Sequence, residues 1–61
     1  MKLHVEIERE PDGRWLGEVP HLPGAHAFGG SRAEAIALAQ ALALRILVEG
    51  KGFRAFAAAA G

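Results

Sequence analysis

The chain has 61 residues, no cysteine, and seven basic side chains balanced by seven acidic ones, so its formal net charge is zero. This length allows one domain, the absence of cysteine excludes disulfides, and the balanced charge disfavours a nucleic-acid-binding protein, which normally carries a basic face. Domains of about 60 residues bury only about 60% of their unfolded surface, so we expect a partner chain to complete the core.

The N-terminal segment begins with apolar side chains at every second position. Leu3, Val5 and Ile7 alternate with polar residues, and this period of two predicts a strand with one buried face. Asp12 and Gly13 follow a proline, a combination typical of a tight turn. The sequence therefore predicts a hairpin between this strand and the next.

The second strand is expected over residues 14–19. Its alternation places Trp15 in the core on the same face as Gly17 and Val19, whereas Leu16 faces outward. Pro20 ends the strand because it has no N–H to donate.

A proline corner follows, in which Pro20 and Pro23 flank Leu22 and Gly24 completes the turn. These residues are consistent either with a structural corner or with a partner-binding loop, so Leu22 is a candidate partner contact. Residues 25–28, which include Phe28, are expected to form a short third strand.

Ser31 and Glu34 have the spacing of a capping box, in which the two side chains bond free N–H groups at the start of a helix. We expect this helix over residues 32–48, followed by Gly50 as its C-terminal cap. Residues 53–57 are expected to form a fourth strand, and residues 58–61 a frayed tail.

These elements predict a single α+β domain with a two-layer βββαβ arrangement. A right-handed crossover would bring the fourth strand back parallel to the first. One layer of helix covers one face of a sheet, so Leu16, Phe28 and Phe56 are predicted to face outward and form an oligomer interface. The helix is apolar on nearly all sides, which also predicts a second chain. We therefore expect a dimer or tetramer.

The polar residues show no pattern typical of an enzyme or a metal centre. The three histidines lack metal-ligand spacing, and the only serine is explained by the helix cap. The acidic side chains near the hairpin fit a solvated charged face better than a catalytic pair, and they form a candidate partner-binding set of Glu6, Glu8, Glu10 and Asp12. We expect neither catalysis nor a cofactor.

Two turns, separated by the spacing typical of a known family, carry a resemblance to that family. The acidic hairpin with Asp12, Gly13 and Trp15 precedes a Pro20-x-Leu22-Pro23-Gly24 corner, and Ser31 and Glu34 then open the helix. Over roughly residues 1–50 this order resembles the N-terminal domain of HicB-type antitoxins, as a stand-alone member of that family.

The resemblance implies a partial ribonuclease-H-like fold that lacks catalytic carboxylates, and an oligomeric assembly. It also implies a cytoplasmic protein that neutralises a small basic toxin which cleaves mRNA. Members commonly carry a further DNA-binding domain, whereas this sequence ends soon after the expected fourth strand, so we expect no direct DNA binding. Ala25 stands where relatives often have cysteine, which excludes a thiol-dependent role. We also expect no association with a membrane. The alternative is an orphan domain without a toxin, with a nucleic-acid-associated or ligand-binding role.

Overall fold

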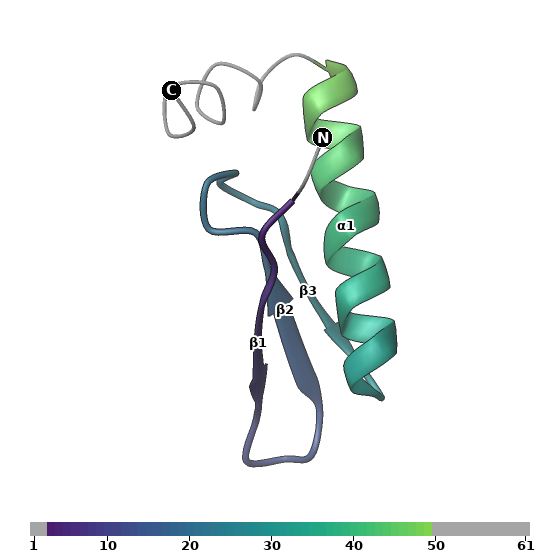
Figure 1. The fold of residues 1–61 in the computed structure, drawn as a ribbon. Helices are drawn as coiled ribbons and strands as arrows, with labels where there is room; N and C mark the ends of the chain where they lie inside the picture. The colour runs from purple at the N-terminus through teal and green to yellow at the C-terminus, as the bar shows by residue number, and fades with distance from the viewer. Residues whose placement is uncertain (1–2, 50–61) are drawn as a thin grey trace.

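The computed structural model of the chain describes residues 3–49. It contains three strands and one helix: β1 (Glu6–Arg9), β2 (Trp15–Glu18), β3 (His26–Gly29) and α1 (Arg32–Glu49). The strands form an antiparallel sheet in the order β1-β2-β3, and α1 lies along one face of it (Figure 1). The predicted α+β class, the antiparallel meander and the single helix are therefore confirmed. The expected fourth strand, with Phe56, and the cap at Gly50 lie outside the described residues.

The β1–β2 hairpin forms for the reasons that its sequence suggests. The N–H of Gly13 donates to the carbonyl of Glu10 over 3.0 Å, and Gly13 has a φ of +91°, a value that suits glycine. Asp12 accepts from the backbone N–H of Arg14 over 3.0 Å and from its side-chain Nε over 2.7 Å. The turn is thus fixed by both backbone and side-chain hydrogen bonds.

The proline corner between β2 and β3 contains a type II turn signature. The N–H of Ala25 donates to the carbonyl of Leu22 over 3.0 Å, with Pro23 and Gly24 between them. Gly24 has a φ of +89°, which this turn requires at its third residue. Gly24 completes the turn, as the sequence predicts, and His21 beside it is exposed.

The helix cap forms as predicted, with one difference in detail. The N–H of Glu34 donates to the Ser31 hydroxyl over 3.1 Å. The Glu34 carboxylate accepts from the N–H of Gly30, at 2.9 Å, rather than from the N–H of Ser31 itself. Both side chains still satisfy N–H groups at the helix start, which explains why α1 begins at Arg32.

The helix approaches the sheet very closely because both surfaces carry small residues. Ala35, Ala39 and Ala43 are completely buried on the sheet-facing side of α1. A Cβ atom added to Gly17 would lie 2.5 Å from the carbonyl oxygen of Ala35, and one added to Gly29 would lie 2.5 Å from the Ala35 nitrogen. Glycine is therefore required at both positions by the distance between helix and sheet.

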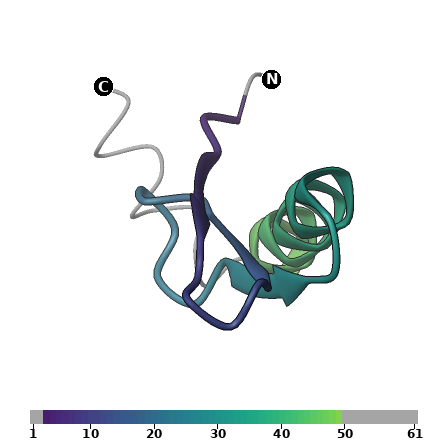
Figure 2. The same cartoon turned by 90° about the horizontal axis from the view of Figure 1, so that it is seen from below.

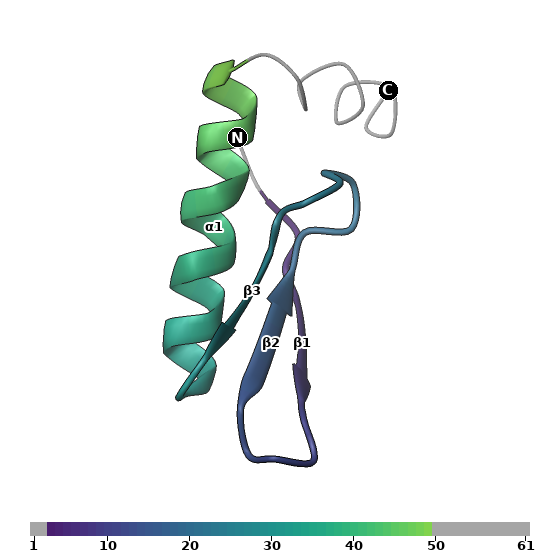
Figure 3. The same cartoon turned by 180° about the vertical axis from the view of Figure 1, so that it is seen from behind.

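The main apolar core joins the proline corner to the C-terminal half of α1. The ribbon views show the corner and this half of the helix at the same end of the sheet (Figures 1 and 3). Leu22 and Val19 are the largest fully buried side chains. The complete cluster, with its half-buried neighbours, consists of Val19, Leu22, Ala25, Ala43, Leu3, Val5, Ile46 and Leu47. The candidate role of Leu22 as a partner contact is therefore wrong: its side chain is 1% exposed, because the corner folds inward onto the helix.

The helix does not cover the three strands equally. It packs mainly on β3 and β2 and contacts β1 least. Seen from below, β1 is the strand that lies farthest from α1 (Figure 2). Val5 and Ile7, on the helix-facing side of β1, are consequently only half-buried. The helix-facing layer is therefore incomplete over β1 within residues 3–49.

Candidate protein-binding surface

The face of the sheet that points away from α1 carries the candidate site. Antiparallel partners point to the same side of a sheet, so the strand register defines two rows on this face. One row runs Glu6, Glu18, His26, and the next runs Glu8, Leu16, Phe28. We call these six residues the outer sheet face.

The apolar part of the outer sheet face is the pair formed by Leu16 and Phe28. Leu16 is half-buried and Phe28 is 43% exposed. The two residues are direct partners across β2 and β3. Both face away from the helix, as the strand alternation predicts for Leu16 and as expected for Phe28. The structure therefore leaves a small apolar patch in the middle of the sheet.

Arg14 connects the hairpin turn to this patch. Its guanidinium carbon lies 4.2 Å from the centroid of the Phe28 ring, a cation–π distance. The same side chain forms a 2.7 Å ion pair with Asp12. The Arg14 backbone N–H and side chain both donate hydrogen bonds to the Asp12 carboxylate, and these bonds lower its pKa. Asp12 is thus part of the turn, with its charge locally balanced, rather than a free member of an acidic surface.

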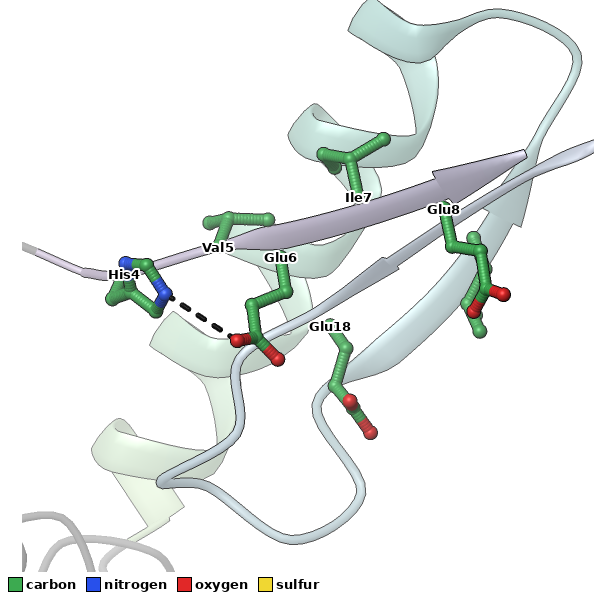
Figure 4. Close-up of a pocket in the computed structure, with 7 residues that line it drawn as sticks. His4, Val5, Glu6, Ile7, Glu8 and Glu18 are labelled. Carbon is green, nitrogen blue, oxygen red and sulfur yellow. Dashed lines mark ion pairs between the residues drawn. The ribbon is translucent and has the colours of Figure 1, made fainter.

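The remaining carboxylates surround the patch on its β1 side. Glu6, Glu8 and Glu18 are exposed, and the close-up in Figure 4 shows them on the opposite side of β1 from Val5 and Ile7. Glu6 and Glu18 are direct cross-strand partners, so two like charges face each other. This arrangement is destabilising in the isolated chain.

The histidines add little to the candidate site. His4 lies 3.7 Å from the Glu6 carboxylate, through Nε2, and both side chains are largely exposed. His26 and His21 are also exposed. Within residues 3–49, no three His, Asp or Glu side chains converge closely enough to hold a metal ion.

An open depression follows the β1 edge of the outer sheet face. Its lining combines both sides of β1 with two residues of β2: His4, Val5, Glu6, Ile7, Glu8, Leu16 and Glu18 (Figure 4). The depression is broad and open to solvent. Such a shape suits the edge of a protein surface better than a small-molecule site, which usually encloses its ligand.

The structure separates the sequence-predicted acidic set into two groups. Glu6 and Glu8 lie on the outer sheet face, whereas Asp12 belongs to the turn and Glu10 precedes it as a half-buried residue. Glu18 joins the acidic row and was missed from the sequence. Its signal was the hairpin length, since a five-residue connection between Arg9 and Trp15 aligns Glu18 with Glu6.

Trp15 also differs from the expected core position. It lies on the helix-facing side, one residue from Leu16, but it is only half-buried. The Arg9 guanidinium carbon lies 5.8 Å from its ring centroid. Because α1 contacts β1 so little, the arginine of β1 covers the indole where the helix does not.

Comparisons with protein-family models, with curated proteins and with solved structures gave no match to this chain. No helix within the described part of the chain has the length and apolar character that a membrane crossing requires.

Proposed function

We propose that this chain is a protein-binding module of the antitoxin type, which neutralises a small basic mRNA-cleaving toxin. The observation that carries the proposal is the outer sheet face, where half-buried Leu16 and exposed Phe28 are bordered by three carboxylates. The HicB-like order of turns in the sequence points in the same direction.

The opposed carboxylates of Glu6 and Glu18 favour a basic partner. Their mutual repulsion is a cost in the free chain, and a lysine or arginine placed between them by a partner would remove it. The apolar patch beside them would supply desolvated contact area, while the charges would steer the encounter. The same carboxylates disfavour the alternative of a nucleic-acid-associated domain, because a phosphate backbone would be repelled.

We also propose that residues 53–57 form the fourth strand of a ribonuclease-H-like sheet, parallel to β1. Two observations support this. β1 is an edge strand of the described sheet, and α1 leaves the helix-facing side of β1 partly uncovered. A right-handed crossover from the end of α1 would place the strand there. Hydrogen exchange tests this fourth strand. The N–H groups of β1 that point away from β2 should be protected in the full chain, and this protection should be lost when residues 53–61 are removed.

The proposed assembly is a cytoplasmic homo-oligomer that uses Leu16, Phe28 and Phe56 as an interface. Leu16 and Phe28 would then belong both to the interface between copies and to the surface that binds the toxin. The acidic row and the apolar pair are adjacent, so a toxin bound at the row would approach the interface from its β1 side. We therefore expect toxin binding and self-association to be coupled.

The toxin hypothesis is tested with the protein encoded by the adjacent reading frame, which we expect to be small and basic. We expect the two chains to co-purify, and Glu8→Lys to slow their association and to weaken its salt dependence. Glu49→Lys is the matched control, because Glu49 is an acidic residue at the far end of α1 that pairs with Arg45 at 3.2 Å.

Two results would contradict the proposal. One is the absence of any complex with the neighbouring protein. The other is RNA cleavage by the isolated chain that is lost when His4, His21 or His26 is replaced by alanine, since an enzyme would then account for the surface better than a binding module.

A further inference from the structure

The exposed side of α1 carries a second apolar surface, separate from the outer sheet face. Ala37, Ala41, Leu44 and Val48 are all exposed, and Leu44 and Val48 have exposed fractions of 51% and 86%. We call these four residues the helix seam. Its residues recur at intervals of four, three and four positions, the spacing at which two helices pack along each other.

The helix seam lies directly opposite the buried side of the helix. At about 100° per residue, the seam is centred on the far side from Ala35, Ala39 and Ala43, which face the sheet. The sheet therefore leaves this apolar stripe uncovered in the described structure. An exposed valine and leucine in line with two alanines is unusual for a helix whose outer side meets only water.

The sizes of the seam residues indicate which occupant fits. When two copies of α1 lie antiparallel about a two-fold axis near residues 42 and 43, Ala37 meets Val48 of the other copy. In the same alignment Ala41 meets Leu44. Each small side chain thus faces a large one, which fills the space between the helices evenly. A parallel pair would instead place small against small and large against large.

The charges along α1 are compatible with this pairing. Between Glu34 and Glu49 the only charged side chain is Arg45, beside the seam. Glu49 lies one turn further on and already holds Arg45 at 3.2 Å, and Glu34 is bonded to the Gly30 N–H. Pairing therefore brings no acidic side chains into the apolar stripe, and each of these charges keeps its own partner at the rim.

We propose that the helix seam binds a second copy of this chain, as an antiparallel helix pair about a two-fold axis. Such an isologous contact needs only the self-complementary pattern that the seam displays. Because α1 and the outer sheet face lie on opposite layers of the domain (Figure 2), the two surfaces can be occupied together. A chain that uses the seam alone forms a dimer, and one that uses both surfaces forms a tetramer where the two two-fold axes intersect at right angles.

The first test measures self-association by analytical ultracentrifugation of the full chain at about 100 μM and below. We expect Leu44→Glu to raise the dissociation constant of the helix-paired dimer by about 30-fold or more, since both copies place a charge in the seam. Ala33→Glu is the control, because Ala33 is exposed in the first turn and lies beyond the end of the paired helix. Circular dichroism establishes that each variant is folded.

A second variant separates this inference from the sheet interface. Phe28→Glu changes only the outer sheet face, so it should reduce a tetramer to a dimer that Leu44→Glu then dissociates. A wild-type monomer at every concentration, or an oligomer dissociated by Phe28→Glu and unaffected by Leu44→Glu, would overturn the helix pairing. Neither result depends on whether a toxin exists.

Engineered cysteines test the direction of the helices, and do not require a destabilising charge. The native chain has no cysteine, so introduced thiols can bond only with each other. In the antiparallel pair, Ala37→Cys chains should cross-link with Val48→Cys chains when the two are mixed and oxidised. Each variant alone should remain uncross-linked, because its two thiols lie about 16 Å apart along the helix axis. Cross-linking of each variant with itself, and not in the mixture, would refute the antiparallel arrangement.

Discussion

Substitution of Gly17 by alanine tests whether the close approach of helix and sheet determines stability. The added methyl group would lie 2.5 Å from the carbonyl oxygen of Ala35 and 2.9 Å from its carbonyl carbon. Both are backbone atoms, so no side-chain rotation relieves the contact and α1 must move away from β2. Forcing extra volume into a closely packed contact typically costs about 1–3 kcal/mol.

That cost is large for a chain of this size. At roughly 0.05–0.15 kcal/mol per residue, the whole domain is stable by only about 3–9 kcal/mol. We expect urea unfolding of Gly17→Ala to show a loss of about 2 kcal/mol or more in the free energy of unfolding. Gly30→Ala is the matched control, because Gly30 is exposed and the nearest atom to an added Cβ is the Glu34 side chain at 3.9 Å.

The control should change the free energy of unfolding by no more than about 0.5 kcal/mol. The double variant with Ala35→Gly should be no more stable than Gly17→Ala alone, since the clash is with the Ala35 backbone. If Gly17→Ala and Gly30→Ala were equally stable, the helix would not be held at the distance described.

Three further substitutions test local features of the fold. Gly24→Val should destabilise the chain by about 1–3 kcal/mol in thermal unfolding because of the φ of +89°, whereas His21→Ala should have no measurable effect; equal melting temperatures would contradict the turn. Asp12→Asn should lose the stabilisation that the lowered pKa of Asp12 provides above its ordinary range. This stabilisation is present above the ordinary Asp pKa of 3.8 and is lost as the pH falls through the lower folded-state pKa, so the difference between wild type and variant should shrink in acid. A difference that stays constant from neutral pH into the acid range would contradict the assignment. Ser31→Ala should cost about 0.5–2 kcal/mol in chemical denaturation and should be neutral only if the cap is absent.

The parts of the fold that depend on neighbours in sequence could be predicted from the sequence. The cap at Ser31 and the turn at Gly24 each involve a few consecutive residues, whose side chains or missing side chains determine the local backbone. The hairpin and the extent of α1 follow from the same kind of information. These features needed no knowledge of what packs against them.

The parts that depend on distances between elements could not be predicted in this way. The sequence places Gly17 on the inward face of its strand but does not show that the helix backbone lies against the sheet at Gly17 and Gly29. Leu22 read as a possible contact for a partner because the sequence does not show that the corner turns inward onto Ile46 and Leu47. In each case the missing information was the position of α1.

The candidate site combines features that neighbouring residues determine with features that depend on how the strands pair. The outward direction of Leu16 followed from alternation along β2, and the structure agrees. The pairing of Asp12 with Arg14 is also local, because an aspartate in a turn commonly accepts a hydrogen bond from the residue two positions on. That Glu6 and Glu18 lie opposite each other could be predicted only from the strand register, and the geometry of the hairpin sets that register.

The composition of the core leads to a final prediction about folding and association. Among the described residues only Val19 and Leu22 are large and fully buried, and the helix contributes alanines to the sheet. Larger apolar side chains of α1, including Leu44 and Val48, are exposed instead. These exposed side chains offer apolar area to a second chain, so folding and association should be coupled. For a dimer that unfolds to monomers, each tenfold rise in concentration should raise the melting temperature by about 6 °C. Differential scanning calorimetry over a hundredfold concentration range measures this, and a melting temperature that stays constant would show that the monomer is stable without either apolar surface being covered.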